Sequence, residues 1–236
     1  IRKRGQIIAS KRADREATEG AVLSRVDATG KYGAIIVLNC ETDFVAKNEG
    51  FVALASSILD AAIASKPANL EALKALDLGG VSVADKVTEQ SGVIGEKIEL
   101  SAFEVVEAES VSAYIHAGNK LATIVGFNQP SVDAQAGKDV AMQIAAMSPI
   151  AVDRNSVDKA TVDHELEIGR DMARNEGKPE AMLDKIAQGR LNKFFKESTL
   201  MEQEFIKDSK MSIGQYLESV SKGLAPVAFK RISLTN

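Results

Sequence analysis

Cysteine, histidine and long apolar runs are scarce in this chain of 236 residues, and each scarcity excludes a class of protein. Cys40 is the only cysteine, which excludes an internal disulfide and fits a reducing compartment. The two histidines, His116 and His164, are too few beside it for a Cys/His zinc site. No apolar run approaches the ~20 residues that a membrane-spanning helix needs, so we expect no membrane partner.

Excess positive charge is absent as well. The chain carries 29 Lys and Arg against 33 Asp and Glu, which gives a formal net charge of −4. An acidic chain has no overall electrostatic attraction to phosphate backbones, so we expect no nucleic-acid partner. The 45% of apolar residues and the interspersed charges are instead typical of a soluble globular protein with one large or two small domains.

Catalytic motifs are a third absence. The sequence holds no Gly-Lys-Ser/Thr phosphate loop, no Gly-x-Gly-x-x-Gly after a strand, no Gly-x-Ser-x-Gly elbow and no paired-histidine metal helix. Cys40 and His116 have the side chains of a nucleophile and its base. However, they end predicted strands in different subdomains, and a buried structural cysteine is the commoner case. We therefore predict a binding protein and not an enzyme, with no catalytic residues, no metal ligands and no cofactor.

The sequence does contain the same order of elements twice: strand, Gly-containing turn, strand, corner and helix. Residues 21–27 and 32–38 predict a first antiparallel hairpin, and residues 111–116 and 120–127 predict a second. The apolar run at 34–38 predicts a buried central strand. This repetition predicts an α+β fold with two similar subdomains, each a small antiparallel sheet covered by helices on one side.

The predicted boundaries follow from this pattern. We place an N-terminal core subdomain at 19–108 and a C-terminal core subdomain at 109–236. Residues 1–18 are interpreted as a solvated linker from a missing N-terminal domain, because the chain opens at Ile1 without a methionine and Gly5 is expected to interrupt any helix. The alternative is a basic arm for an acidic partner. The basic residues of this segment are Arg2, Lys3, Arg4, Lys11, Arg12 and Arg15.

A helical hairpin is predicted as an insertion in the C-terminal subdomain, at about 156–196. A charged helix over 156–176 ends at Gly177-Lys178-Pro179, where glycine stops one helix and proline starts the next. The narrow apolar stripe favours two helices that pack mainly on each other and project as a coiled-coil-like arm. The alternative is a compact pair of helices packed on the core.

The stretch Asn39-Cys40-Glu41-Thr42-Asp43-Phe44-Val45-Ala46 joins the predicted central strand to a long helix. In the simplest interpretation, Thr42 or Asp43 caps the helix and Phe44 packs back on the sheet. In the second interpretation, Asp43 and Phe44 protrude as a wedge that inserts into a partner. Periodicity alone does not choose between them. Asn48-Glu49-Gly50 further predicts a bend or break in the helix.

The same stretch closely resembles the signature of the elongation factor Ts family, and other motifs match that family in order and spacing along the whole chain. These motifs are Arg2-Lys3-Arg4-Gly5 with Lys11-Arg12-Ala13, Glu19-Gly20, Val93-Ile94-Gly95-Glu96, Tyr114-Ile115-His116, and Gly177-Lys178-Pro179 with Gly189-Arg190. One short motif could arise by chance, whereas an ordered set is specific. The resemblance implies two duplicated subdomains and a projecting helical hairpin, in agreement with the patterns above.

The resemblance also implies a function. It implies a guanine-nucleotide exchange factor that binds elongation factor Tu, in its GDP and nucleotide-free forms, and promotes GDP release during translation elongation. In the family, the Asp-Phe pair at the matching corner intrudes near the Mg²⁺ and phosphates bound to Tu. Ile94 and Gly95 match a second contact position, and His116 matches a contact of the second subdomain. The expected partner-binding residues are therefore Thr42, Asp43, Phe44, Val45, Ile94, Gly95 and His116.

The remaining implications concern context. The resemblance implies a cytoplasmic protein that needs no bound nucleotide of its own, and it leaves a homo-oligomer open. The family's N-terminal ubiquitin-associated-like domain is expected to be missing from this sequence. The alternative function is a non-catalytic interaction scaffold of the same fold, without exchange activity.

Overall fold

The computed structural model describes residues 1–235, which form two compact units. Unit 1 comprises Ile1–Ala145 and the segment from Ala228 onward, and unit 2 comprises Ala146–Val227. Within residues 1–235, no helix combines the length and the apolar character that crossing a bilayer requires. Both predicted strand hairpins fall in unit 1, and the predicted helical hairpin falls in unit 2.

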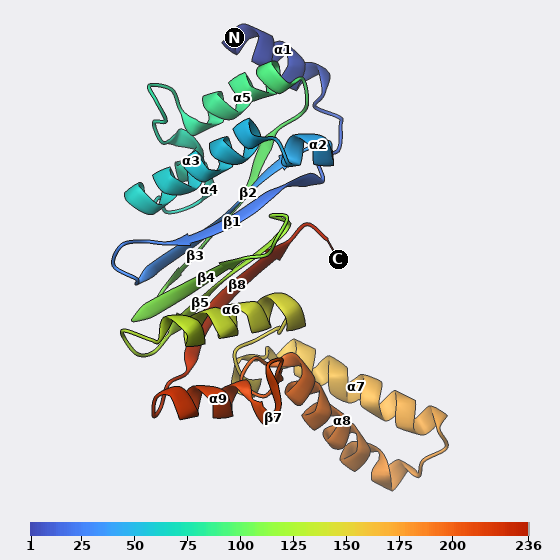
Figure 1. Cartoon of the computed structure of the whole chain (residues 1–236). Coiled ribbons are helices and arrows are strands. Elements are labelled where there is room, and N and C mark those ends of the chain that lie inside the picture. The colour runs from blue at the N-terminus through green and yellow to red at the C-terminus, as the bar shows by residue number, and fades with distance from the viewer. Residues whose placement is uncertain (236) are drawn as a thin grey trace. The chain divides into compact units, whose positions relative to one another are not determined.

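The first sheet of unit 1 is built around the strand that is predicted to be buried. Its strands are β1 (Glu19–Val26), β2 (Tyr32–Cys40) and β3 (Glu99–Glu107), antiparallel in the order β1-β2-β3 (Figure 1). Every residue of β2 is buried, which confirms the predicted central strand. Successive side chains point to opposite faces, so that Ile36 packs with the helices and Ile35 with the second sheet.

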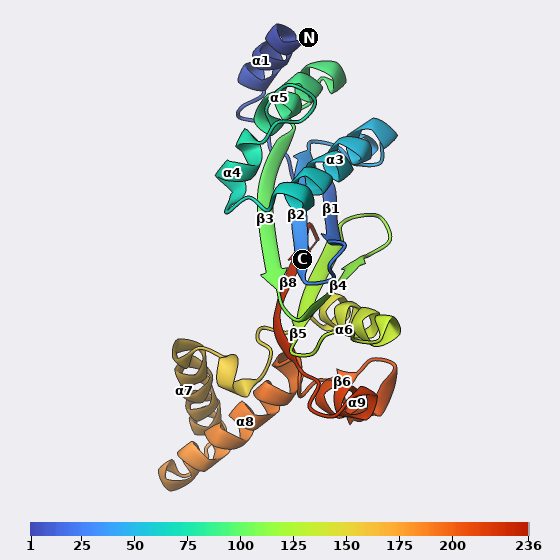
Figure 2. The same cartoon turned by 90° about the vertical axis from the view of Figure 1, so that its left-hand side faces the viewer.

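Helices cover one face of this sheet (Figure 2). They are α2 (Asp43–Ala46), α3 (Glu49–Ser65), α4 (Leu70–Ala75) and α5 (Val83–Ile94). The side chains that α3 buries recur at three-and-four spacing and are Phe51, Leu54, Ala55, Ile58, Leu59 and Ala62. The predicted break near residues 48–50 is confirmed, because α2 ends at Ala46 and Asn48 starts a new helix. The Asn48 side chain accepts a hydrogen bond from the Phe51 amide at 3.1 Å.

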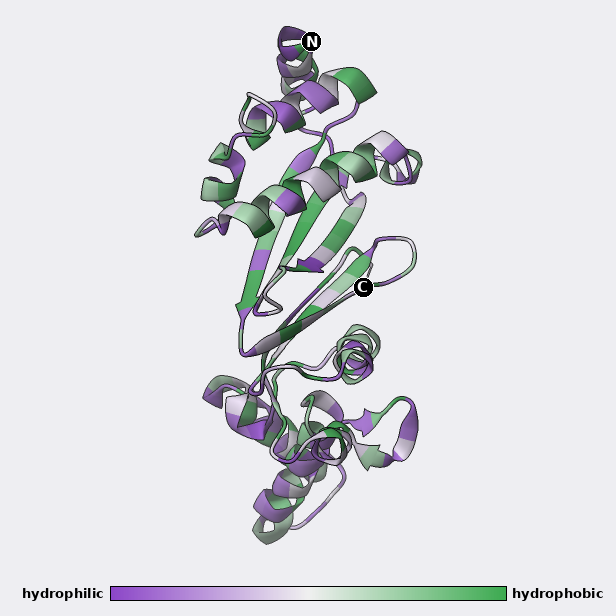
Figure 3. Ribbon diagram, turned by 60° about the vertical axis from the view of Figure 1, so that its left-hand side comes forward, coloured by the Kyte–Doolittle hydropathy of each residue, from purple (hydrophilic) through white to green (hydrophobic). Residues whose placement is uncertain are grey.

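A second sheet packs on the other face of the first. Its strands are β4 (Ser110–Ile115), β5 (Leu121–Phe127) and β8 (Pro226–Ser233), in the order β4-β5-β8, and α6 (Ala134–Met147) follows β5. Val37 of β2 and Ile124 of β5 belong to one apolar cluster between the sheets, and Figure 3 shows the apolar strands. The fold is therefore α+β with small antiparallel sheets and helices, as predicted. The predicted boundary at 108/109 falls inside unit 1, and the division into two similar subdomains stays a prediction.

The prediction that Gly5 interrupts any helix is wrong, whereas most of residues 1–18 are exposed, in agreement with the prediction of a solvated segment. Arg2–Lys11 form helix α1, which packs on α5 (Figure 1). Gly5 is buried at this crossing, where a Cβ would lie 2.2 Å from the carbonyl oxygen of Thr88. Gly92 faces it, and a Cβ there would lie 2.6 Å from the Gly5 nitrogen. The helices tolerate these glycines because, without side chains, the two backbones approach more closely than side chains would permit.

Gly5→Ala is therefore expected to weaken the docking of α1, although alanine is the better helix former by roughly 1 kcal/mol. The added methyl group meets backbone atoms, so overpacking should cost about 1–3 kcal/mol. Amide hydrogen exchange should then show lost protection in residues 2–11. The matched control is Gly189→Ala, in a helix where nothing lies within 4 Å of the added Cβ, which should stabilise by about 0.5–1 kcal/mol. The same change in stability for both variants would contradict the packing role of Gly5.

Unit 2 contains the predicted helical hairpin. Its elements are α7 (Lys159–Asn175), the 3₁₀ turn η2 (Glu180–Met182) and α8 (Leu183–Ser198). Gly177, at φ 78°, ends the first helix as predicted. The helices pack on each other where Gly169 meets Ala187, and a Cβ on Gly169 would lie 3.0 Å from the Ala187 Cα. Arg190 and Glu176 form an ion pair across the hairpin at 3.0 Å. Within unit 2, the tip of the hairpin extends away from α9 (Ile213–Val220) (Figures 1 and 2).

A short ribbon in unit 2 has no counterpart among the predicted elements. The remaining elements of the unit are η1 (Arg154–Ser156), β6 (Glu204–Phe205) and β7 (Asp208–Ser212). β6 and β7 pair antiparallel, and a strand of two residues is too short to show a period in the sequence. α9 begins directly after β7, where Ser212 and Gln215 form a capping box.

Candidate functional site

The candidate site is the short turn of helix after β2, residues 42–46, which we call the corner. Thr42 caps α2 in an extended conformation, and its hydroxyl oxygen accepts a hydrogen bond from the Val45 amide at 3.4 Å. Ala46 is buried, and Val45 packs partly buried on the core of unit 1. Phe44 points the other way and is 83% exposed. The capping part of the simplest interpretation is confirmed, whereas the packing of Phe44 on the sheet is wrong.

Asp43 stands beside this exposed ring in the first turn of α2. Its side chain is 48% exposed and lies 3.6 Å from the Lys47 ammonium, one turn further along. Exposed pairs at this spacing contribute only about 0.3–0.5 kcal/mol. The Asp43 carboxylate is therefore held loosely and can exchange Lys47 for another partner at little cost.

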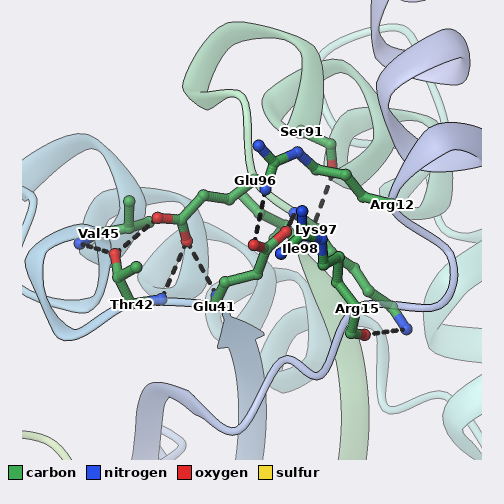
Figure 4. Close-up of polar contacts among 9 residues, drawn as sticks. All are labelled: Arg12, Arg15, Glu41, Thr42, Val45, Ser91, Glu96, Lys97 and Ile98. Carbon is green, nitrogen blue, oxygen red and sulfur yellow. Dashed lines mark hydrogen bonds and ion pairs between the residues drawn. The ribbon is translucent and has the colours of Figure 1, made fainter.

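The corner is fastened from outside by Glu96 (Figure 4). One oxygen of its carboxylate accepts hydrogen bonds from the backbone amides of Glu41, at 2.9 Å, and Thr42, at 3.1 Å. The other oxygen accepts from the Thr42 hydroxyl at 2.6 Å. Hydrogen bonds to a carboxylate are shorter and stronger than neutral ones. Glu96 thus fixes the backbone just before Asp43 and Phe44.

Glu41 returns the contact. Its carboxylate accepts a hydrogen bond from the Lys97 amide at 2.7 Å and pairs with the Arg12 guanidinium at 2.7 Å. Burial raises the pKa of the Glu41 carboxyl, but the Lys97 amide and the Arg12 charge outweigh burial and hold that pKa below its usual value. We call the reciprocal contacts of Glu41 and Glu96 the carboxylate lock. The lock joins the end of β2 to the link between α5 and β3. Through its contact with Glu41, Arg12 also attaches the segment that follows α1.

The carboxylate lock brings the predicted contact residues of the corner close to those of the link between α5 and β3, which are Ile94 and Gly95. Gly95 caps α5 in the left-handed conformation, at φ 84°, directly before Glu96. Ile94 is partly buried against the core, whereas its neighbour Val93 is 62% exposed. Val93 is not among the predicted site residues, and its exposure makes it the apolar side chain of this link that a partner can reach. The sequence signal was its place beside Ile94, without any indication of which side chain faces out.

His116 lies on a different element, just after β4, and is exposed. Its Nδ1 lies 2.9 Å from the hydroxyl oxygen of Tyr114. The turn after it is tied to the start of β1, since Lys120 pairs with Glu19 at 3.1 Å. Glu19 is the register partner of Cys40, the last residue of β2. The turn with His116 therefore lies at the same end of the sheets as the corner (Figure 1).

Cys40 is buried directly behind the corner. Its side chain has no exposed surface, and its thiol donates a hydrogen bond to the Thr42 carbonyl oxygen at 3.2 Å. Burial, with the nearby Glu96 and Glu19 carboxylates, raises the pKa of the Cys40 thiol to about 12. A thiol in this state is a poor nucleophile, so the structure gives no support to a Cys40–His116 pair.

Cys40 is accordingly expected to resist alkylation in the folded chain. At pH 8, iodoacetamide should label it at least about 100-fold more slowly than in the chain unfolded by guanidinium, because the thiolate is scarce and covered. Mass spectrometry of timed samples measures both rates. Comparable rates in the folded and unfolded chain would contradict the burial of Cys40 and revive the hypothesis of a reactive cysteine.

These features define a class of site. Within residues 1–235, no group of three or more His, Cys, Asp or Glu side chains comes together to hold a metal ion. The corner presents an exposed aromatic ring beside a carboxylate, on backbone that several hydrogen bonds hold in place. Rigid aromatic side chains at a surface are typical of the residues that dominate protein–protein interfaces. The geometry is therefore that of a candidate protein-contact site.

Comparison with known proteins identifies the family. A family model described as Elongation factor TS matches residues 41–236. Elongation factor Ts of Porphyromonas gingivalis is 53% identical over 235 residues, which cover 99% of this chain and 85% of the relative. The proteins of that name from Christiangramia forsetii and Chloroherpeton thalassium are 51% identical over 99% of this chain and 43% identical over 95% of it, covering 85% and 80% of those relatives. The chain belongs to the elongation factor Ts family.

Proposed function

We propose that this chain is a guanine-nucleotide exchange factor that binds elongation factor Tu and promotes GDP release during translation elongation in the cytoplasm. The observation that carries the proposal is the exposed Phe44 ring on a fastened corner, in a member of the elongation factor Ts family. The exposed Phe44 ring makes few packing contacts in its own chain, so burying the ring in a partner breaks none of the contacts that stabilise the fold. Its apolar area is therefore available as binding free energy.

The residues of the corner have separate roles in this proposal. Phe44 fills an apolar pocket on Tu, while Thr42 and Val45 hold the turn that presents it. Asp43 brings a carboxylate to the Mg²⁺ and phosphates of the bound nucleotide. The ion neutralises much of the phosphate charge, so disturbing its surroundings weakens nucleotide binding efficiently. Ile94, Gly95 and His116 provide further contacts at the same end of unit 1.

Thermodynamic linkage explains how binding becomes exchange. If the chain binds nucleotide-free Tu more tightly than Tu with GDP, it must weaken GDP binding by the same factor. A protein that binds both forms equally shifts nothing, however tightly it binds. GTP then replaces the released GDP by mass action. The chain itself needs no bound nucleotide and breaks no bond.

The test is a pair of equilibrium titrations. The affinity of the chain for Tu is measured with and without GDP, and the affinity of Tu for GDP is measured with and without the chain. We expect each ligand to weaken the other by the same factor, of roughly tenfold or more. Tight binding of the chain to Tu with no effect of GDP would instead support the alternative, a non-catalytic interaction scaffold of the same fold. No binding to either form would exclude both.

A further inference from the structure

The corner is too short to order itself. α2 has four residues, and an isolated helical turn is unstable in water because nucleation fixes several dihedral angles for few hydrogen bonds. Its own backbone hydrogen bonds join Ala46 to Thr42, at 3.2 Å, and Lys47 to Asp43, at 3.1 Å. The Phe44 ring adds no packing, since it is 83% exposed. The orientation of the ring therefore depends on contacts that the corner makes with the rest of unit 1.

These contacts hold the corner on both sides of Phe44. On its C-terminal side, Ala46 is buried in the core of unit 1. On its N-terminal side, the Glu96 carboxylate accepts three hydrogen bonds, from the amides of Glu41 and Thr42 and from the Thr42 hydroxyl. Glu96 lies 55 residues after Glu41 in the chain, so this is a tertiary contact and not part of the local turn.

Glu41 makes the reciprocal contact. Its carboxylate accepts a hydrogen bond from the Lys97 amide, directly after Glu96. The segment at 41–42 and the segment at 96–97 therefore each bind the backbone of the other through a glutamate side chain. Arg12 pairs with Glu41, and the Lys97 ammonium donates to the carbonyl oxygens of Ala13, at 3.0 Å, and Arg15, at 3.2 Å. The segment after α1 thereby braces the same point (Figure 4).

We propose that Glu96 is a positioning residue that orders the corner before the partner arrives, so that Phe44 and Asp43 are presented in one orientation. The inference rests on the proposed function. Ordering a loop on binding lowers affinity, and a loop that is already ordered avoids that loss. Glu41 and Arg12 complete the lock by holding the segment that carries Glu96. None of the three residues needs to touch the partner.

Two substitutions of Glu96 separate geometry from charge. Glu96→Ala removes all three acceptor contacts. Glu96→Gln can keep them, because its amide oxygen accepts from the two backbone amides and its amide nitrogen donates to the Thr42 hydroxyl oxygen, which has two lone pairs. The matched control is Glu99→Gln, which removes the same charge from an exposed residue of β3 that lies outside the lock.

Hydrogen exchange of the chain alone gives the first readout. In Glu96→Ala, we expect the amides of residues 42–47 to lose protection by about tenfold or more, with the protection of α3 and the thermal midpoint nearly unchanged. Glu96→Gln should keep protection within about threefold, because the acceptor geometry survives. Unchanged protection of residues 42–47 in Glu96→Ala would overturn the lock, whatever the chain does to Tu.

GDP release from Tu gives the second readout, as a function of the concentration of the chain. In Glu96→Ala, the concentration for half-maximal acceleration should rise about tenfold or more, while the maximal rate at saturation changes little, because bound Tu can still order the corner. Glu96→Gln and Glu99→Gln should behave nearly as the unaltered chain does. A loosened corner with an unchanged half-maximal concentration would overturn the positioning role. Equal losses in the Gln and Ala variants would overturn it too, since charge and not geometry would then matter.

The two readouts keep this inference distinguishable from the proposed function. If the unaltered chain does not accelerate GDP release, the proposed function fails and the positioning role falls with it, whereas hydrogen exchange still judges the lock. If the unaltered chain accelerates release and the corner stays protected in Glu96→Ala, the proposed function stands and this inference alone is overturned.

Discussion

Phe44→Ala is expected to reduce the efficiency with which the chain accelerates GDP release by roughly 100-fold, while the free energy of unfolding changes by less than about 1 kcal/mol. The ring is 83% exposed, so its removal leaves no cavity in unit 1. At an interface, a desolvated aromatic anchor contributes about 2–4 kcal/mol, and 1.4 kcal/mol corresponds to a factor of ten. Stopped-flow release of a fluorescent GDP and denaturant unfolding measure the two quantities.

A second exposed apolar side chain controls for this variant. Ile150 is 54% exposed in unit 2, and Ile150→Ala removes apolar surface that the proposed contact does not use. We expect it to leave GDP release unchanged. A loss of about 3 kcal/mol or more of unfolding free energy in Phe44→Ala would mean that the ring is core and not contact surface.

Phe51→Ala should have the opposite profile. Phe51 follows in the next helix, has no exposed surface, and belongs to the cluster that joins α3 to the first sheet. Removing a buried phenyl ring loses its transfer free energy and leaves a cavity, so the free energy of unfolding should fall by about 3–5 kcal/mol. The helix cap should persist, since the Phe51 backbone amide, and not its ring, donates to Asn48.

Denaturant unfolding of both phenylalanine variants gives a direct comparison. Because the same side chain is removed from the same unit, differences in chemistry cancel and burial alone separates them. We expect Phe51→Ala to be less stable than Phe44→Ala by at least about 2 kcal/mol. Equal destabilisation would contradict the placement of one ring in the core and the other in solvent.

Local patterns of the sequence predict much of this fold. The apolar run at 34–38 marks β2 because a strand buried on both faces has no polar alternation. The break before α3 follows from Asn48, a residue that caps helices, two positions before Gly50. Gly177 and Pro179 mark the helical hairpin through their backbone preferences alone. Each of these signals lies within a few residues of the feature that it predicts.

Long-range contacts account for what the sequence does not predict. Gly5 weakens a helix by propensity, and glycine is required there only because the backbone of α5 at Thr88 approaches it closely. The carboxylate lock joins residues 55 positions apart, and a glutamate in a link carries no local sign of its acceptor role. The exposure of Phe44 is also not predictable from local sequence. An apolar residue in the first turn of a helix can point to the core or to solvent, and only the surrounding packing decides which.

The proposed function is tested most directly by the rate at which fluorescent GDP leaves elongation factor Tu, alone, with this chain, and with its Asp43→Ala/Phe44→Ala variant. Strong acceleration by the chain, largely lost in a variant that binds more weakly but folds normally, is the expected result. Acceleration that survives intact in the double variant would contradict exchange through the corner. Release at the same rate with and without the chain would contradict the proposed exchange activity itself.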